Sequence, residues 1–182
     1  MASHSADPAQ RRARITADIV ARTGIDDAMI ARLVQRFYER ARRDALLGPI
    51  FETRVTDWPG HLAAMCDFWS SVALLSGRYH GQPMAKHLPL PVDAAHFDRW
   101  LALFEEAAED VCPPAAAAHF IERARRIAES LELGVASAAG VLLGKGQRYR
   151  TGAADRADAP TGASGGRIMR RARPSSKQGV DG

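Results

Sequence analysis

Apolar residues recur every three to four positions along four stretches of the chain, and this periodicity restricts the fold more than any other feature. Such spacing places apolar side chains on one face of a helix and leaves the other face to charged residues. The alternation of apolar and polar residues that indicates a half-buried strand is not seen. The four apolar stripes are Ile30, Leu33, Val34, Phe37, Tyr38 and Ala41; Trp58, His61, Leu62, Met65, Trp69 and Val72; Phe97, Trp100, Leu101, Phe104 and Val111; and Phe120, Ala124, Ile127, Ala128 and Leu131. We therefore expect an all-α fold in which four long helices share one core.

Local signals predict where these helices begin and end. Aspartates suited to begin the first three helices are Asp26 or Asp27, Asp57 and Asp93. A carboxylate at such a position accepts hydrogen bonds from backbone N–H groups that have no partner within the helix. Residues 48–51 are expected to form a turn and an apolar connector, and Gly134 is expected to end the last helix in a left-handed conformation.

The chain divides into three predicted regions. Residues 1–24 form a polar leader that is partly disordered, with a weak helical pattern over 8–23. Residues 25–135 contain the periodic stretches and form the folded domain. Residues 136–182 are rich in Gly, Ala, Ser and Arg without periodicity, which predicts a disordered, basic, low-complexity tail.

The positive charge of the chain is concentrated in this tail. Residues 137–182 contain nine Lys and Arg against three Asp and Glu, a net charge of +6; because the whole chain carries +4, the part before them carries −2. A mildly acidic domain argues against nucleic acid as its partner. The basic cluster at 170–173 is suited to contact an anionic surface, although such charge runs usually do no more than solvate a tail.

The cellular compartment is predicted from the absence of membrane-spanning, secretory and disulfide patterns. Neither an apolar run long enough to span a bilayer nor an apolar secretory signal is present, so we expect no membrane association. Cys66 and Cys112 are the two cysteines, and they form neither a disulfide framework nor a CxxC pair. These observations favour a reducing, cytoplasmic location.

His87 lies in a loop between the second and third stripes, with two predicted long helices before it and two after it. Neutral imidazole is a good ligand for haem iron, and we hypothesise that His87 holds such an iron through one ring nitrogen. Its other nitrogen then needs an orienting partner, and a backbone carbonyl from residues 82–84 is favoured because no carboxylate lies nearby in the sequence. The alternatives are a solvated loop histidine, or His80 as the ligand in its place.

Tyr38, His61 and Trp100 occupy otherwise apolar stripes on three different helices, and each carries a hydrogen-bond donor. Buried donors need partners. Either the three point at a shared ligand in a pocket, or each finds a carbonyl of its own, as buried Tyr and Trp commonly do.

Several short motifs between about Leu33 and Leu133 together resemble the truncated haemoglobins, specifically their group III branch. The motifs are Phe37-Tyr38, Leu47-Gly48-Pro49-Ile50-Phe51, Asp57-Trp58-Pro59-Gly60-His61-Leu62, Phe68-Trp69, Tyr79-x-Gly81-x-Pro83-Met84-x-x-His87 and His96-Phe97-x-x-Trp100-Leu101. The resemblance covers about one hundred residues and excludes both termini. The Gly-Gly motifs of the other two branches are missing, which favours group III.

This resemblance implies a two-over-two helical sandwich around a haem b with a pentacoordinate iron. His87 matches the proximal iron ligand, and Tyr38, His61 and Trp100 match the distal residues that face a bound ligand. Phe51, Met65 and Tyr79 match residues that contact the haem.

The implied function is the binding of O2 and related diatomic ligands. Two or three donors, each contributing about 1 kcal/mol, would stabilise the bound ligand by roughly 2–3 kcal/mol. This stabilisation corresponds to dissociation that is about 30- to 150-fold slower. Slow release suits retention, scavenging or redox detoxification of NO or peroxide better than delivery. NO dioxygenase or weak peroxidase activity would need an unidentified electron donor.

Two other functional classes compete with the haem hypothesis. A cofactor-free helical bundle would act as a protein-interaction module through its surface or its tail. A non-haem metal site would use His61 and His87, but no carboxylate cluster accompanies them.

Overall fold

The computed structural model describes residues 7–151, and these form seven helices and no strand, which confirms the all-α prediction. The helices are α1 (Pro8–Thr23), α2 (Asp27–Ala41), α3 (Gly48–Arg54), α4 (Trp58–Leu74), α5 (Pro83–His87), α6 (Ala94–Val111) and α7 (Pro114–Ala138). None of the helices in this part of the chain has the length and apolar character needed to cross a membrane.

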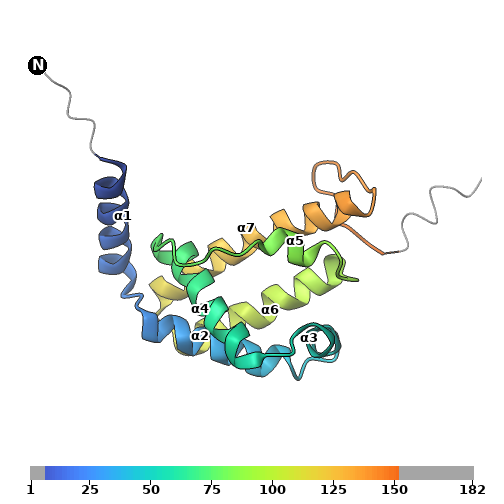
Figure 1. The fold of residues 1–182 in the computed structure, drawn as a ribbon, viewed down its shortest axis with the longest axis horizontal. Coiled ribbons are helices and arrows are strands. Elements are labelled where there is room, and N and C mark those ends of the chain that lie inside the picture. Colours follow the sequence, from blue (N-terminus) through green and yellow to red (C-terminus); the bar gives the residue numbers. More distant parts are fainter. Residues whose placement is uncertain (1–6, 152–182) are drawn as a thin grey trace, which may run out of the picture.

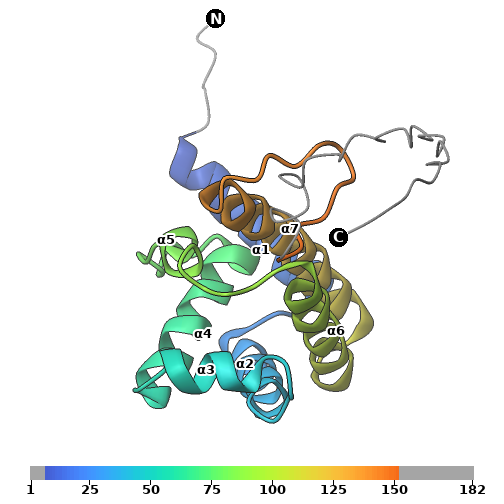
Figure 2. The ribbon, with the colours of Figure 1, turned by 90° about the vertical axis from the view of Figure 1, so that its right-hand side faces the viewer.

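The four long helices α2, α4, α6 and α7 form two layers. Helix α2 packs against α4 within one layer, α6 packs against α7 within the other, and α2 also lies against α6 across the layers (Figures 1 and 2). Leu33, Phe104 and Phe120 are fully buried where the layers meet. This arrangement is the predicted two-over-two sandwich.

The predicted helix starts are confirmed for three of the long helices. The carboxylate of Asp26 accepts a hydrogen bond from Met29 N at 2.7 Å, and that of Asp57 accepts one from Gly60 N at 3.1 Å. Asp93 begins α6 in the same way. Each such cap stabilises its helix by about 1 kcal/mol.

The end of the last helix differs from the prediction. Gly134 does not end α7, which continues to Ala138. Gly140 takes the left-handed conformation instead, with φ of 77°, and the bonds from Val141 N to Ala136 O and from Gly140 N to Ser137 O close the helix. Gly134 has another role: a Cβ there would collide with Sδ of Met84, so the glycine lets α5 approach α7 closely.

Two predicted irregular segments are also corrected. Residues 48–51, expected to be a turn and an apolar connector, belong to the short helix α3, which continues to Arg54. Residues 136–151, predicted to belong to a disordered tail, instead continue α7 and then fold back onto the domain. In the leader, the weak pattern over 8–23 is a regular helix, α1, which projects from the rest of the domain (Figure 1). The remainder of the predicted leader and tail, including the basic cluster at 170–173, lies outside the described residues.

Candidate functional site

A cavity of about 430 Å³ lies between the two helical layers, with α5 along one side. All seven site residues predicted from the sequence line it: Tyr38, Phe51, His61, Met65, Tyr79, His87 and Trp100. They come from α2, α3, α4, α5, α6 and the segment before α5. The size is that of a typical small-molecule or cofactor site.

His87 is the last residue of α5, a helix of five residues that begins at Pro83. Its ring nitrogen Nδ1 lies 2.7 Å from the carbonyl oxygen of Pro83. Because a carbonyl only accepts hydrogen bonds, Nδ1 carries a proton and donates, so in the neutral ring Nε2 is the nitrogen with the free lone pair. The structure therefore confirms the prediction that a backbone carbonyl within residues 82–84 orients this histidine.

Tyr38 and His61 lie together in the lining of the cavity. Their ring centroids are 5.0 Å apart and the rings meet edge to face, while Phe51 and Trp58 stand edge to face against Tyr38 at 5.5 and 5.8 Å. Burial raises the pKa of the Tyr38 hydroxyl, with a smaller contribution from Tyr79. Burial, and then the charge of Lys86, lowers the pKa of His61. At neutral pH these are a protonated phenol and a neutral imidazole.

The donors of this group do not use carbonyls of their own within residues 7–151. Nε2 of His61 is buried and has no hydrogen-bond partner there. Neither the hydroxyl of Tyr38 nor the indole N–H of Trp100 forms a hydrogen bond with another described residue. Trp100 is instead held by its ring, which is stacked on Phe104 at 5.2 Å and lies edge-on to Phe37 at 5.4 Å. Such free donors fit the shared-pocket interpretation better than the alternative.

Further residues of the cavity were not predicted from the sequence. Phe68 and Ile127 extend its apolar walls, and Arg54 and Lys86 add cationic side chains. Phe68 belongs to the Phe68-Trp69 motif and Lys86 directly precedes His87, so both could have been recognised in the sequence as candidates for the site. Arg54 could not have been, because an arginine on a short polar helix usually faces water.

The other histidines within residues 7–151 have structural roles or are exposed. His80, the alternative iron ligand, is exposed to solvent. His96 completes the cap of α6 and also lines the cavity. His119 is partly buried, and its Nε2 donates to the carbonyl of Ala73 at 3.1 Å.

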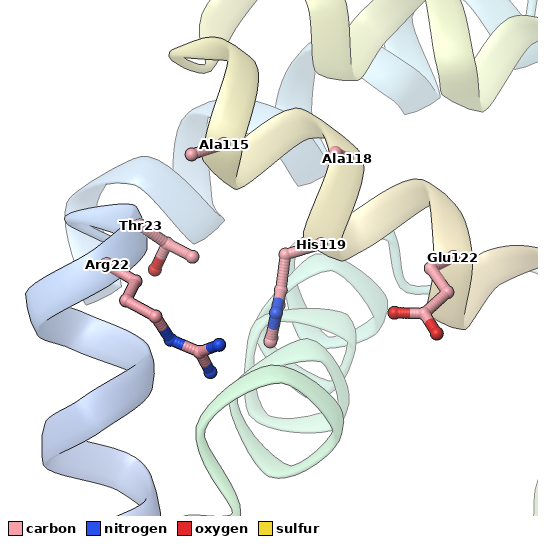
Figure 3. Close-up of a pocket in the computed structure, with 6 residues that line it drawn as sticks. All are labelled: Arg22, Thr23, Ala115, Ala118, His119 and Glu122. Atoms are coloured by element: carbon pink, nitrogen blue, oxygen red, sulfur yellow. The ribbon is translucent and has the colours of Figure 1, made fainter.

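Another hollow, of about 290 Å³, lies between α1 and α7, and it contains none of the predicted site residues. Figure 3 shows Arg22 of α1 and His119 of α7 pointing into it. His119 is already engaged with the end of α4, so we assign this hollow to helix packing.

The described residues give no support to a non-haem metal site. No group of three or more His, Cys, Asp or Glu side chains that could hold a metal ion occurs among residues 7–151. The cysteines are not activated either, since burial raises the pKa of Cys66 and raises that of Cys112 to about 11.

Comparison with known proteins gives one consistent answer. The sequence model of the bacterial-like globins matches residues 22–132. The chain is 37% identical over 113 residues to the group 3 truncated hemoglobin ctb of Campylobacter jejuni, covering 59% of this chain and 89% of that protein. It is 32% identical over 89 residues to the group 2 truncated hemoglobin YjbI of Bacillus subtilis, covering 48% and 67%. The crystal structure of the group III truncated hemoglobin from Campylobacter jejuni superposes with a TM-score of 0.56 at 38% identity, covering 59% of this chain and 88% of that one.

The chain therefore belongs to the bacterial-like globin family, as a truncated haemoglobin of group III. Membership confirms the resemblance found in the motifs, and it makes the protein a haem-binding globin.

Proposed function

We propose that Nε2 of His87 holds the iron of a haem b, and that Tyr38, His61 and Trp100 donate hydrogen bonds to a diatomic ligand on the opposite side. The observation that carries the proposal is the hydrogen bond from Nδ1 of His87 to the Pro83 carbonyl. It fixes the tautomer whose remaining nitrogen can bind a metal, and it orients the ring.

The chemistry of the cavity fits a haem. Its walls are mainly apolar, as a porphyrin ring requires, and Phe51, Met65 and Tyr79 would contact the ring. Arg54 and Lys86 provide cations for the two carboxylates of a haem. In the same cavity, the buried Nε2 of His61 has no partner in residues 7–151, which is the condition expected of a group that serves a ligand.

When bound, haem supplies an iron that takes O2 or a related diatomic molecule as ligand, and the chain determines how long that ligand stays. Tyr38 remains protonated because burial raises its pKa, and Trp100 is an obligate donor. Donors fixed in a water-poor pocket stabilise negative charge on a ligand at about 1 kcal/mol each. We infer a role in retention, scavenging or redox detoxification rather than delivery.

The proximal hydrogen bond restricts the redox chemistry we propose. His87 donates to a neutral carbonyl rather than to a carboxylate, which leaves the imidazole a weaker electron donor to a metal. We therefore include NO dioxygenation or slow peroxide turnover, with an external electron donor, and leave out strong peroxidase activity.

The visible absorption spectrum of the purified protein, ferric and then ferrous, tests this function. We expect a strong Soret band in the wild type that weakens or shifts in His87→Ala, because the proximal ligand is lost. His80→Ala is the matched control, since His80 lies seven residues upstream and is exposed. Its spectrum should equal that of the wild type.

Two outcomes would contradict the proposal. A Soret band that is unchanged by His87→Ala would show that His87 is not the iron ligand. A wild type that stays colourless with excess haem would favour the second candidate function, a cofactor-free bundle that binds a protein partner.

A further inference from the structure

Residues 139–151 follow α7 and return across the start of α6, and we name this segment the strap. A turn over 144–147 reverses its direction, with hydrogen bonds between Gly144 and Gln147 in both directions. The match to the globin family ends at residue 132, so the strap lies beyond the part of the chain shared with the family.

The strap neutralises a buried carboxylate of the globin domain. The side chain of Glu132 on α7 is 7% exposed. Arg148 Nε lies 2.9 and 3.0 Å from its two oxygens, and Tyr149 N donates to it at 2.8 Å. Removing one partner of a buried ion pair is strongly destabilising, because the other charge is left without compensation. The last matched residue of the family domain therefore depends on partners outside that domain.

The strap also holds the first turn of α6. The carbonyl of Tyr149 accepts a hydrogen bond from Ala94 N at 2.7 Å, and this N–H has no partner within the helix. Thr151 donates its hydroxyl at 3.0 Å to Asp93, the residue that begins α6, and Arg148 also pairs with Asp98 at 2.7 Å. Three residues of the strap are thus joined by directional contacts to Asp93, Ala94 and Asp98.

The part of the domain under the strap is a wall of the cavity. Tyr149 is buried in a cluster with Val92, Phe97 and Ala128. Those three residues also line the cavity that contains His87. The strap therefore packs against residues that line the pocket, at the start of α6 and along α7.

We propose that the strap retains haem in the pocket, with Arg148 as the positioning residue that locks it to Glu132. The inference rests on the proposed function. Without the lock, the start of α6 is free to move away from α7, which opens the wall formed by Val92, Phe97 and Ala128.

Haem transfer from the full-length ferric protein to excess apomyoglobin measures this retention directly. We expect Arg148→Ala to release haem at least about tenfold faster than the wild type. Arg150→Ala is the matched control, because Arg150 lies on the same segment and is exposed, and it should release haem at the wild-type rate. Because Arg148 and Glu132 form one lock, Glu132→Gln alone should also release haem faster, and the double variant should release it little faster than either single variant, whereas two independent weakening effects would add.

The outcomes separate the two proposals. A wild type that binds no haem overturns the proposed function. A wild type that binds haem, with Arg148→Ala releasing it no faster than Arg150→Ala, overturns the strap inference alone. If Arg148→Ala takes up no haem, Arg148→Lys replaces it in the test, since it keeps the charge but loses the two-pronged pairing. Release by Arg148→Lys at the Arg150→Ala rate would likewise overturn the inference, and faster release would support it.

Discussion

The hydrogen bond from His87 to Pro83 illustrates how a single backbone contact defines the chemistry of a side chain. A loop histidine with both nitrogens in water has no fixed tautomer. Here the bond to a carbonyl four residues earlier assigns the proton to Nδ1, because α5 places the two groups 2.7 Å apart. The short helix therefore orients the ring whose other nitrogen, Nε2, we propose as the ligand of the haem iron.

The Tyr38 hydroxyl can be tested as a single donor to the bound ligand. Tyr38→Phe removes one donor and keeps the ring packing against His61, Phe51 and Trp58. At about 1 kcal/mol for the lost hydrogen bond, O2 should dissociate about fivefold faster. Stopped-flow measurement of O2 release checks this.

Tyr149→Phe is the control for that measurement. The strap uses backbone atoms of Tyr149 for its hydrogen bonds, so loss of this hydroxyl should leave O2 release unchanged. An equal rate in Tyr38→Phe and in the wild type would exclude Tyr38 as a donor to the ligand.

Among the helices, α4 shows how elements outside the pocket fix an element within it. It carries His61 and Met65, and its last carbonyls are satisfied by side chains of two other helices. Thr16 of α1 donates to Leu74 O at 2.6 Å, His119 of α7 donates to Ala73 O at 3.1 Å, and Arg123 of α7 donates to Val72 O at 3.3 Å. These bonds replace the partners that the end of a helix lacks.

Thr16→Val tests this cap with little change of shape. The carbonyl of Leu74 loses its donor, and the free energy of unfolding should fall by about 1 kcal/mol. Urea denaturation followed by circular dichroism measures the change. Thr53→Val is the control: the Thr53 hydroxyl also bonds a carbonyl, that of Ile50, but at an exposed position. A loss no greater than that of the control would show that Thr16 adds nothing to the cap.

The elements that could be predicted from the sequence are those whose signals are local. Helical periodicity and single aspartates defined α2, α4 and α6, and one histidine in a loop between stripes indicated the site. Short or distant features were missed. Both Gly134 and Gly140 suit a helix end by residue type, and only the approach of Met84 shows why Gly134 lies inside α7. The strap lacks periodicity, and its contacts join Arg148 to Glu132 and Tyr149 to Ala94, pairs that no local pattern connects.

For the whole molecule, Asp93 couples the strap to stability in acid. Burial alone would raise its pKa, but hydrogen bonds from His96 and from Thr151 outweigh burial and lower the pKa to about 2. A carboxyl pKa lowered from its ordinary 3.8 contributes stability above about pH 4 that is lost as the pH falls towards 2. The full contribution is about 2 kcal/mol.

Asp93→Asn should therefore remove this pH dependence. Above pH 5 the variant should be less stable than the wild type, and the difference should shrink as the pH falls below about 4. Urea denaturation of both proteins at several pH values measures the difference, in which acid effects common to both cancel. A difference that stays constant between pH 5 and 3 would contradict the role of the carboxylate.

The capped end of α4 and the lock at Glu132 have a consequence for where this protein can be divided. Homology to the globin family spans residues 22–132. A fragment cut at those limits would lose Thr16, leaving the carbonyl of Leu74 without its donor, and would keep Glu132 without Arg148. The part of the chain that matches the family is therefore smaller than the part that supplies these contacts, which includes at least α1 and the strap.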